Sequence, residues 1–199
     1  SRKLEARYGQ LVTELVENAA PLSSAELADF VSRYSAAAAT AELVVLTGSL
    51  PPATPSSFYA QLLERTCGRT LLDVRGPELL AALPRRPWLV KPNRAELEHT
   101  WGRSLADERA LRAAMRDLNH QGAEWVLVTQ GPGPLWLSSA TQCFRFDPVP
   151  NPRPVNPIGC GDCLAAGIAV GMVRGEPLPD SVALGIAAAA ANADDLLPA

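Results

Sequence analysis

Short apolar runs recur along the chain and predict the strands of a parallel β-sheet. The first, at residues 43 to 48, reads Leu-Val-Val-Leu-Thr-Gly, and similar runs occupy residues 70 to 74, 88 to 91 and 125 to 129. Runs of this length that end in Gly or a polar residue are typical of strands buried on both faces. Stretches with a helical pattern accompany them, at residues 23 to 39, 55 to 66, 104 to 120 and 161 to 174. This alternation indicates βα units and an α/β fold.

The pattern changes after residue 130. The tetrapeptide Gly-Pro-Gly-Pro at residues 131 to 134 is a turn, and residues 135 to 138 and 143 to 146 have the composition of short strands. Two such strands predict an antiparallel edge beside the parallel sheet. The sequence contains no internal repeat and no low-complexity linker, and a length of 199 residues suits one domain. We therefore predict a single α/β domain over residues 1 to 199.

Composition and charge narrow the classes of partner. Hydrophobic residues make up 47% of the chain, enough for a substantial core, and the formal net charge is only −3 with the basic residues scattered. Such a charge distribution does not favour nucleic acid. The apolar stretches are shorter than the roughly 20 residues of a membrane-spanning helix, and the polar amino end does not resemble a signal peptide. We expect a cytoplasmic protein, with reduced cysteines and neither nucleic acid nor membrane as partner.

The glycine-rich segment at residues 156 to 167, Asn-Pro-Ile-Gly-Cys-Gly-Asp-Cys-Leu-Ala-Ala-Gly, carries the strongest chemical signal. Its first glycines, Gly159 and Gly161, lie at the start of a predicted helix, where unpaired backbone N–H groups and the helix dipole can bind an anion. Asp162 lies at the same end and can accept a proton from a hydroxyl. An anion hole beside a carboxylate suits phosphoryl transfer. The alternative is that the glycines only shape a loop and Asp162 caps the helix.

A second group of polar residues follows the predicted strand at residues 88 to 91. Glu96 lies three residues after Asn93, so that both side chains share one face of a helical turn. An amide and a carboxylate suit Mg2+ through its water shell, and Lys91 offers a point charge to a nucleotide phosphate. The alternatives are a helix cap at Asn93 completed by Glu96 as a capping box, and an ordinary surface lysine at Lys91.

The segment Asn-Pro-Ile-Gly-Cys-Gly-Asp at residues 156 to 162 resembles the carboxy-terminal signature of the ribokinase-like kinases of the phosphofructokinase-B type. That signature commonly begins with Asp-Thr. Asn156 and Pro157 stand there instead, as in the branch that contains 1-phosphofructokinase and tagatose-6-phosphate kinase, and Cys160 occupies the position of a small residue. Five further segments agree with the family in order and spacing, at residues 13 to 17, 47 to 52, 72 to 73, 91 to 97 and 126 to 131.

The resemblance implies a ribokinase-like three-layer α/β/α sandwich with a mostly parallel sheet and an antiparallel edge. It also implies ATP and Mg2+ as cofactors, and transfer of the γ-phosphoryl group to a hydroxyl of a ketohexose phosphate: fructose 1-phosphate, fructose 6-phosphate or tagatose 6-phosphate. Asp162 would be the catalytic base. The backbone N–H groups of the three preceding residues would form the anion hole, namely Gly159, Cys160 and Gly161.

The resemblance also assigns the residues that bind the nucleotide. Asn93 and Glu96 match the family's Asn-x-x-Glu element, which is tied to Mg2+ and phosphate. Thr129 and Gly131 would contact the nucleotide, although a hairpin turn would need the same residues. Asn192 would approach the adenine, with an ordinary helix residue near the chain end as the alternative.

The chain departs from the family in its amino-terminal part. Family kinases are longer, and their amino-terminal part supplies sugar-binding strands, much of a lid and a Gly-Gly-Lys-Gly-x-Asn element, whereas this sequence has no Gly-Gly pair. We therefore expect most of the sugar-binding part and the lid to be missing. A kinase fragment, a kinase completed by a partner chain, and a noncatalytic nucleotide-binding or assembly module all stay open. Core surface left exposed would favour association, for example as a homodimer.

Other functional motifs are weaker. Cys160 and Cys163 have the spacing of a redox pair, which makes a thiol oxidoreductase a rival hypothesis, but the second cysteine pair and the preceding Trp of such enzymes are not evident. A dinucleotide fingerprint would need Gly at the position of Leu164. The sequence has no Gly-x4-Gly-Lys-Ser/Thr loop, and its two histidines are isolated, so that zinc is not implied.

Overall fold

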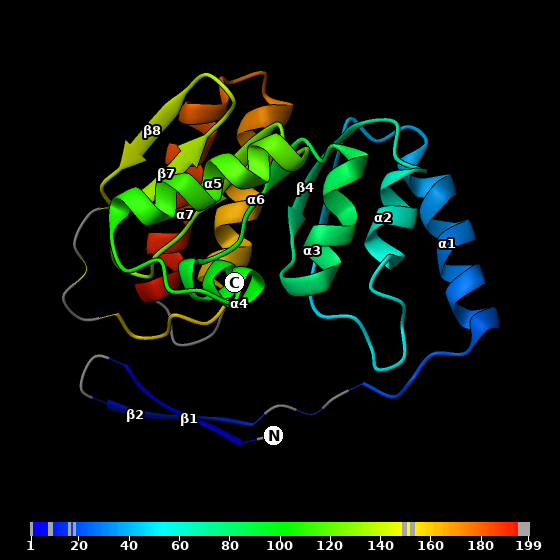
Figure 1. Cartoon of the computed structure of the whole chain (residues 1–199), viewed down its shortest axis with the longest axis horizontal. Helices are drawn as coiled ribbons and strands as arrows, with labels where there is room; N and C mark the ends of the chain where they lie inside the picture. Colours follow the sequence, from blue (N-terminus) through cyan, green and yellow to red (C-terminus); the bar gives the residue numbers. More distant parts are fainter. Residues whose placement is uncertain are drawn as a thin grey trace.

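A six-stranded mixed sheet forms the centre of the molecule (Figure 1). The structure is a computed structural model that describes residues 2 to 7, 10 to 15, 17, 19 to 148, 151 and 154 to 194. The strands follow one another across the sheet in chain order, and the first four are parallel. The last two are antiparallel, so that the predicted α/β fold with an antiparallel edge is confirmed. The strands are β3 (Leu43–Thr47), β4 (Arg69–Asp73), β5 (Leu89–Val90), β6 (Trp125–Val128), β7 (Leu135–Ser138) and β8 (Cys143–Phe146).

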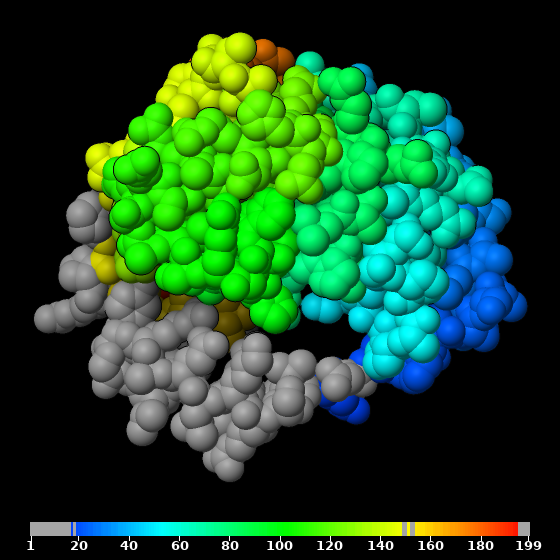
Figure 2. Space-filling model, in the orientation of Figure 1, coloured from blue at the N-terminus to red at the C-terminus, as the bar shows by residue number. Residues whose placement is uncertain are grey.

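Helices cover both faces of this sheet and complete three layers. The described helices are α1 (Ser24–Ala38), α2 (Phe58–Leu63), α3 (Gly76–Ala82) with the 3-10 turn η1 (Leu83–Arg85), α4 (Arg94–Trp101), α5 (Glu108–Gln121), α6 (Cys160–Val173) and α7 (Leu178–Asp194). Figure 2 shows α1 to α5 as a continuous surface on one side of the molecule. Helices α6 and α7 pack on the other face.

Alternation along the strands explains the two cores. Successive side chains of a strand point to opposite faces, so a strand that is apolar throughout serves both cores. Leu72 and Val90 pack with α1 to α5, whereas their neighbours Leu71 and Leu89 pack with α6 and α7. All four side chains are fully buried. The continuous apolar runs of the sequence therefore specify a sheet that is covered on both sides.

Capping residues set the ends of several helices. The Ser23 hydroxyl accepts a hydrogen bond from the Glu26 amide and starts α1, where the sequence predicts a helix. The predicted helix at residues 104 to 120 begins later, at Glu108, because the Asp107 carboxylate accepts from the Ala110 amide and caps it there. The predicted helix at residues 55 to 66 is also shorter, Phe58–Leu63.

A separate two-stranded antiparallel sheet lies near the amino end, formed by β1 (Arg2–Arg7) and β2 (Gln10–Leu15). The apolar-run pattern does not predict it, because both strands mix polar and apolar residues. Within the described part of the chain, no helix combines the length and the apolar character needed to cross a membrane.

Helices α6 and α7 touch each other backbone to backbone. A Cβ atom added at Gly167 of α6 would lie 2.6 Å from the Cα atom of Gly185 in α7, and one added at Gly185 would lie 2.5 Å from the Leu164 carbonyl oxygen. A Cβ atom added at Gly171 would lie 2.6 Å from the hydroxyl oxygen of Ser181 and 2.9 Å from its Cα atom. Only glycine permits such an approach. We call this contact of Gly167, Gly171 and Gly185 the glycine seam; it fixes the position of α6, whose first turn carries the glycine-rich motif.

We predict that Gly167→Ala destabilises the fold. The added methyl group overlaps the backbone of α7 at 2.6 Å, so we expect the upper part of the roughly 1 to 3 kcal/mol that overpacking costs. This exceeds the roughly 1 kcal/mol that alanine gains over glycine in a helix. Urea unfolding of the two proteins gives the difference. Val173→Ala is the matched control on the same helix, because Val173 is 65% exposed. Equal unfolding midpoints for Gly167→Ala and the wild type would contradict a tight seam.

Candidate active site

The first turn of α6 presents backbone N–H groups at the mouth of the helix. Gly159 is the N-cap with a φ of +83°, a conformation that glycine adopts without strain, and its carbonyl accepts the Cys163 amide at 2.8 Å. The Cys160 amide donates to the Pro157 carbonyl over 3.4 Å. In the described part of the chain, the amides of Gly161 and Asp162 donate to no protein acceptor. Of the predicted anion hole, the amide of Gly161 is open whereas that of Cys160 is bonded to Pro157, and the amide of Asp162, which was not predicted, is open as well.

A buried ammonium group lies against this turn. Lys91, 4% exposed, follows β5, and its Nζ atom lies 2.7 Å from Oδ2 of Asp73 at the end of β4. A Cβ atom added at Gly161 would lie 3.5 Å from the same Nζ atom. Reading Lys91 as an ordinary surface lysine is thus wrong. Its positive charge stands next to the open amides, where it can attract the same anion.

Asp73 is the member of the site that the sequence analysis did not single out as a functional residue. Burial raises the pKa of Asp73, while the charge and the hydrogen bond of Lys91 lower it, and the carboxylates of Glu96 and Asp162 raise it again. Two further carboxylates, those of Glu96 and Asp162, thus act on the Asp73 carboxyl group beside Lys91. One feature of the sequence could have identified Asp73: it is a polar residue at the end of an apolar strand. Such residues come together because the carboxyl ends of parallel strands lie at one edge of the sheet.

Asp162 is exposed at the mouth of α6. None of the ion pairs found in the described part of the chain involves its carboxylate. It is near enough to Asp73 to affect that carboxyl group. The carboxylate and the open amides thus belong to the same turn, as the kinase resemblance implies, and the role of Asp162 as a base stays a prediction.

Asn93 and Glu96 form a complete capping box at the start of α4. The Asn93 Oδ1 atom accepts from the Glu96 amide at 2.9 Å, and Glu96 Oε2 accepts from the Asn93 amide at 2.8 Å. The other carboxylate oxygen of Glu96 lies 3.8 Å from Nη1 of Arg75. The capping alternative is confirmed, and the predicted roles in binding Mg2+ and phosphate stay predictions.

The side chains of Asn93 and Glu96 suit a Mg2+ ion that is bound mainly through water. Among the described residues, no three His, Cys, Asp or Glu side chains converge into a metal cage. Mg2+ commonly keeps several waters and uses one or two carboxylates together with substrate phosphates. Glu96, with Asn93 beside it, meets that requirement.

Thr129 and Gly131, the residues predicted to contact the nucleotide, lie beside the capping box of α4. Thr129 pairs with Asn93 as an isolated parallel bridge, and its carbonyl accepts the Arg94 amide at 2.9 Å. Gly131 is exposed in the next turn, with a φ of +60°. The Gln130 side chain links this turn to α4, since it accepts from Arg94 at 2.7 Å. The structure thus brings Thr129 next to Asn93, and a contact with nucleotide stays a prediction.

Asn192 lies behind the first turn of α6. It is 3% exposed, and its amide nitrogen donates to the Ile158 carbonyl at 2.8 Å. The sulfur atoms of Cys160 and Cys163 each lie 3.4 Å from its side-chain amide. Asn192 therefore ties α7 to the loop that enters α6, and its predicted contact with adenine stays a prediction.

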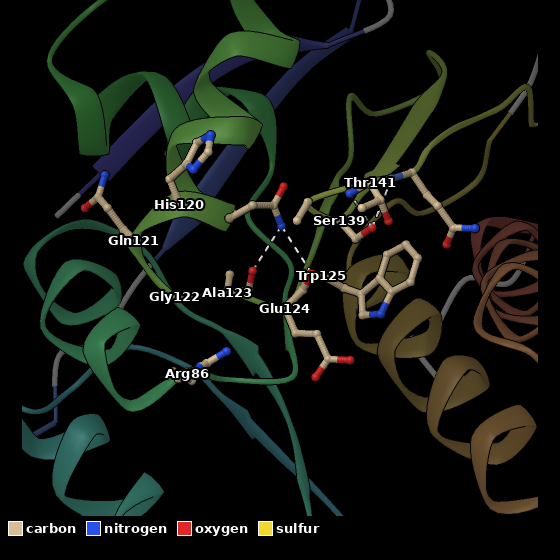
Figure 3. Close-up of a pocket in the computed structure, with 12 residues that line it drawn as sticks. Arg86, His120, Gln121, Gly122, Ala123, Glu124, Trp125, Ser139 and Thr141 are labelled. Carbon is tan, nitrogen blue, oxygen red and sulfur yellow. Dashed lines mark hydrogen bonds between the residues drawn. The ribbon is translucent and has the colours of Figure 1, made fainter.

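A pocket of about 700 Å³ lies elsewhere, at the amino end of β6 (Figure 3). It is lined by the end of α5, the segment from Gly122 to Trp125 and the turn between β7 and β8. Asn119 donates there to the Ala123 carbonyl at 3.0 Å. The lining residues include none of the residues predicted for phosphoryl transfer, which gather at the carboxyl ends of the strands.

Residues 4–195 match the family described as pfkB family carbohydrate kinase. A 1-phosphofructokinase of Bacillus subtilis is 33% identical over 156 residues, which are 76% of this chain and 51% of that protein. Phosphofructokinase-2 from Escherichia coli in complex with potassium superposes with a TM-score of 0.83 at 25% identity, covering 94% of this chain and 61% of that chain. The Arabidopsis thaliana ribokinase complexed with ribose and ATP shares the fold, with a TM-score of 0.69 at 20% identity over 94% of this chain and 60% of that chain. The chain thus spans about half the length of the curated relative.

We predict that Lys91→Met lowers stability in a pH-dependent way. The substitution removes the two influences that lower the pKa of Asp73, so this pKa rises further above its unfolded value. A raised carboxyl pKa favours folding below the unfolded pKa, and that contribution is lost as pH rises through the folded pKa. The variant should therefore be close to the wild type at about pH 4 and lose roughly 3 kcal/mol at about pH 7.

Urea unfolding at the two pH values measures this difference. Arg33→Met is the control, because its partner Asp29 is exposed and the pair lies on the surface. A deficit of Lys91→Met that stays constant or shrinks as pH rises would contradict the buried pair.

Proposed function

Because the chain belongs to the pfkB family of carbohydrate kinases, we propose that the whole protein transfers the γ-phosphoryl group of ATP to a hydroxyl of a ketohexose phosphate. One observation carries the proposal. The open amides of Gly161 and Asp162 stand beside the buried ammonium group of Lys91, at the carboxyl edge of a parallel sheet. Ligands of α/β sheets commonly bind outside this edge, and a helix amino terminus there suits a phosphate.

In the proposed transfer, the backbone of the first α6 turn binds the phosphate and the side chain of Asp162 accepts the proton. The amides of Gly161 and Asp162 and the charge of Lys91 bind the phosphate oxygens and stabilise the charge that develops on them. The Asp162 carboxylate accepts the proton of the sugar hydroxyl, whose oxygen bonds to phosphorus as the bond to the leaving phosphate oxygen breaks. Asp73 keeps Lys91 in place through the 2.7 Å ion pair.

Asn93 and Glu96 complete the proposed site on the side of α4. Glu96 would hold Mg2+ through water while its second oxygen keeps the capping bond to Asn93. The metal supplies neutralisation of charge on the phosphates when it is bound. Thr129 and Gly131 would face the nucleotide, since Thr129 already pairs with Asn93. Asn192 would keep the loop that enters α6 in place, through its hydrogen bond to the Ile158 carbonyl.

The relatives support fructose phosphates as the acceptors to test first. The Bacillus subtilis relative is a 1-phosphofructokinase, and one structure of the Escherichia coli relative is in complex with fructose-6-phosphate. Fructose 1-phosphate is therefore our first acceptor, with fructose 6-phosphate and tagatose 6-phosphate beside it. We also keep a location in the cytoplasm and a homodimer within the proposal; the Escherichia coli relative has a tetrameric inhibited form.

A noncatalytic nucleotide-binding or assembly module is the second candidate function. The observation behind it is that the open amides of Gly161 and Asp162 beside Lys91 suit the binding of a phosphate by themselves, whether or not a phosphoryl group is then transferred. A module of this kind would bind MgATP and transfer no phosphate. Calorimetric titration with MgATP, run beside a kinase assay on the three sugar phosphates, separates the two functions: binding with turnover supports the kinase, and binding without any turnover supports the module.

We predict that Gly161→Ala weakens the binding of MgATP at least about tenfold, a loss of about 1.4 kcal/mol. The new methyl group would meet only the Lys91 ammonium group, at an ordinary 3.5 Å, so the fold tolerates it while the phosphate loses its close approach. Calorimetric titration gives the affinity. Ala166→Ser, at an exposed position of the same helix, should bind as the wild type does. Unchanged affinity in Gly161→Ala would refute the anion hole.

Asp162→Asn should separate binding from catalysis. The amide side chain cannot accept the hydroxyl proton as a carboxylate does, whereas the backbone amide of residue 162 remains. In the whole protein, we expect turnover to fall by a factor of about 100 or more and the affinity for MgATP to be retained. A coupled assay of sugar phosphorylation measures turnover, and turnover equal to that of the wild type would rule out the assigned base.

A further inference from the structure

Two cysteines share the first turn of α6 with the proposed phosphate-binding amides. Cys160 is the first residue of the helix, and Cys163 follows three residues later, so both side chains lie on one helix face. Both are free thiols with partly exposed side chains. The two sulfur atoms contact the same side-chain amide, that of Asn192, at 3.4 Å each. The phosphoryl transfer proposed above uses neither thiol.

The geometry of a helix brings such a pair close to disulfide distance. Side chains three residues apart have Cβ atoms about 5 to 6 Å apart, whereas a disulfide requires about 3.5 to 4.5 Å. The pair can therefore be bridged only if the first turn contracts by roughly 1 to 2 Å. The backbone contact with α7 begins at Leu164 and continues at Gly167 and Gly171, so a contraction confined to residues 160 to 163 leaves that contact intact.

We propose that Cys160 and Cys163 form a redox-sensitive dithiol, and that its oxidation to an intrahelical disulfide abolishes phosphate binding at the mouth of α6. The oxidant is a two-electron thiol oxidant such as a diazene. Each thiol loses one hydrogen atom, a bond forms between the two sulfur atoms, and the N=N group takes up both hydrogens to become a hydrazine. The second half of this proposal rests on the phosphate-binding function proposed above.

Contraction of the turn acts directly on the amides. Gly161 and Asp162 lie between the two cysteines in the chain, so their N–H groups must reorient when the sulfur atoms meet. The Asn192 amide would also lose its contacts with two thiols while it still holds the Ile158 carbonyl. A disulfide formed with such distortion is strained and readily reduced, which makes the modification reversible.

The described residues favour a disulfide over a metal at this pair. A soft metal held by two thiolates would need further ligands, usually four in all for a closed site. In the ranges that the structure describes, no third His, Cys, Asp or Glu joins the pair to form a metal group. The side-chain amide of Asn192 contacts both sulfur atoms, and an amide is not a ligand that a soft metal prefers.

The test uses a Cys67→Ser/Cys143→Ser background, because these two cysteines are exposed elsewhere and would also react. The protein is treated with the diazene diamide, freed of reagent, and measured by intact mass and by calorimetric titration with MgATP. We expect a loss of two hydrogen masses without dimerisation, a fall in MgATP affinity of at least about tenfold, and full recovery of both after dithiothreitol.

Cys163→Ser in the same background is the matched control, and it should bind MgATP with unchanged affinity before and after diamide. Disulfide-linked dimers, the absence of the mass loss, or a disulfide that leaves the affinity unchanged would each overturn the proposal. If the reduced protein does not bind MgATP, the phosphate-binding function fails and the switch fails with it. The intact mass still decides whether the disulfide forms, so the two failures are distinguishable.

Discussion

The backbone contact between α6 and α7 sets the position of the glycine-rich turn to which we assign phosphate binding. Gly167 and Gly185 bring the two helices so close that no side chain fits between them. This contact holds the mouth of α6 at the carboxyl edge of the sheet, against the ends of β4 and β5. The open amides, the carboxylate of Asp162 and the ammonium group of Lys91 are neighbours for this reason.

The charges at this mouth are arranged around one buried cation. Lys91 is almost fully buried and is compensated by Asp73, while Glu96 and Asp162 add negative charge near the pair. Arg75, 3.8 Å from Glu96, offsets part of this charge, which leaves three carboxylates and two basic groups in the site. Mg2+ bound with a nucleotide would add positive charge beside these carboxylates, which connects the electrostatics of the site to the proposed function.

Much of the fold could be predicted from the sequence, because the sheet is buried on both faces. The apolar runs at β3, β4, β5 and β6 are short but distinct from the helical patterns around them, so their strands were recognisable, and the Gly-Pro-Gly-Pro turn marked the change to antiparallel pairing. Helix limits were less accurate where a side-chain cap decides them, as at Asp107. The β1 and β2 pair was missed because its residues mix polar and apolar types.

The site could be predicted only in part. The glycine-rich turn and the Asn93 to Glu96 element are local in sequence, so their spacing was informative, and the structure shows the capping box at the latter. The Lys91 to Asp73 pair joins two strands, and a contact between strands leaves no spacing to recognise. Asn192 was singled out by family resemblance, yet its place behind α6 follows from the packing of α7, which no short motif encodes.

The central claim is that the first turn of α6 binds phosphate, and amide NMR tests it most directly. In a titration of 15N-labelled protein with MgATP, the account predicts saturable shifts of the Gly161 and Asp162 amide protons. The Gly122 amide, which lies in the pocket at the amino end of β6, should remain unchanged. Shifts at Gly122 with none at Gly161 and Asp162 would show that the nucleotide binds at the other end of the sheet and would contradict the account.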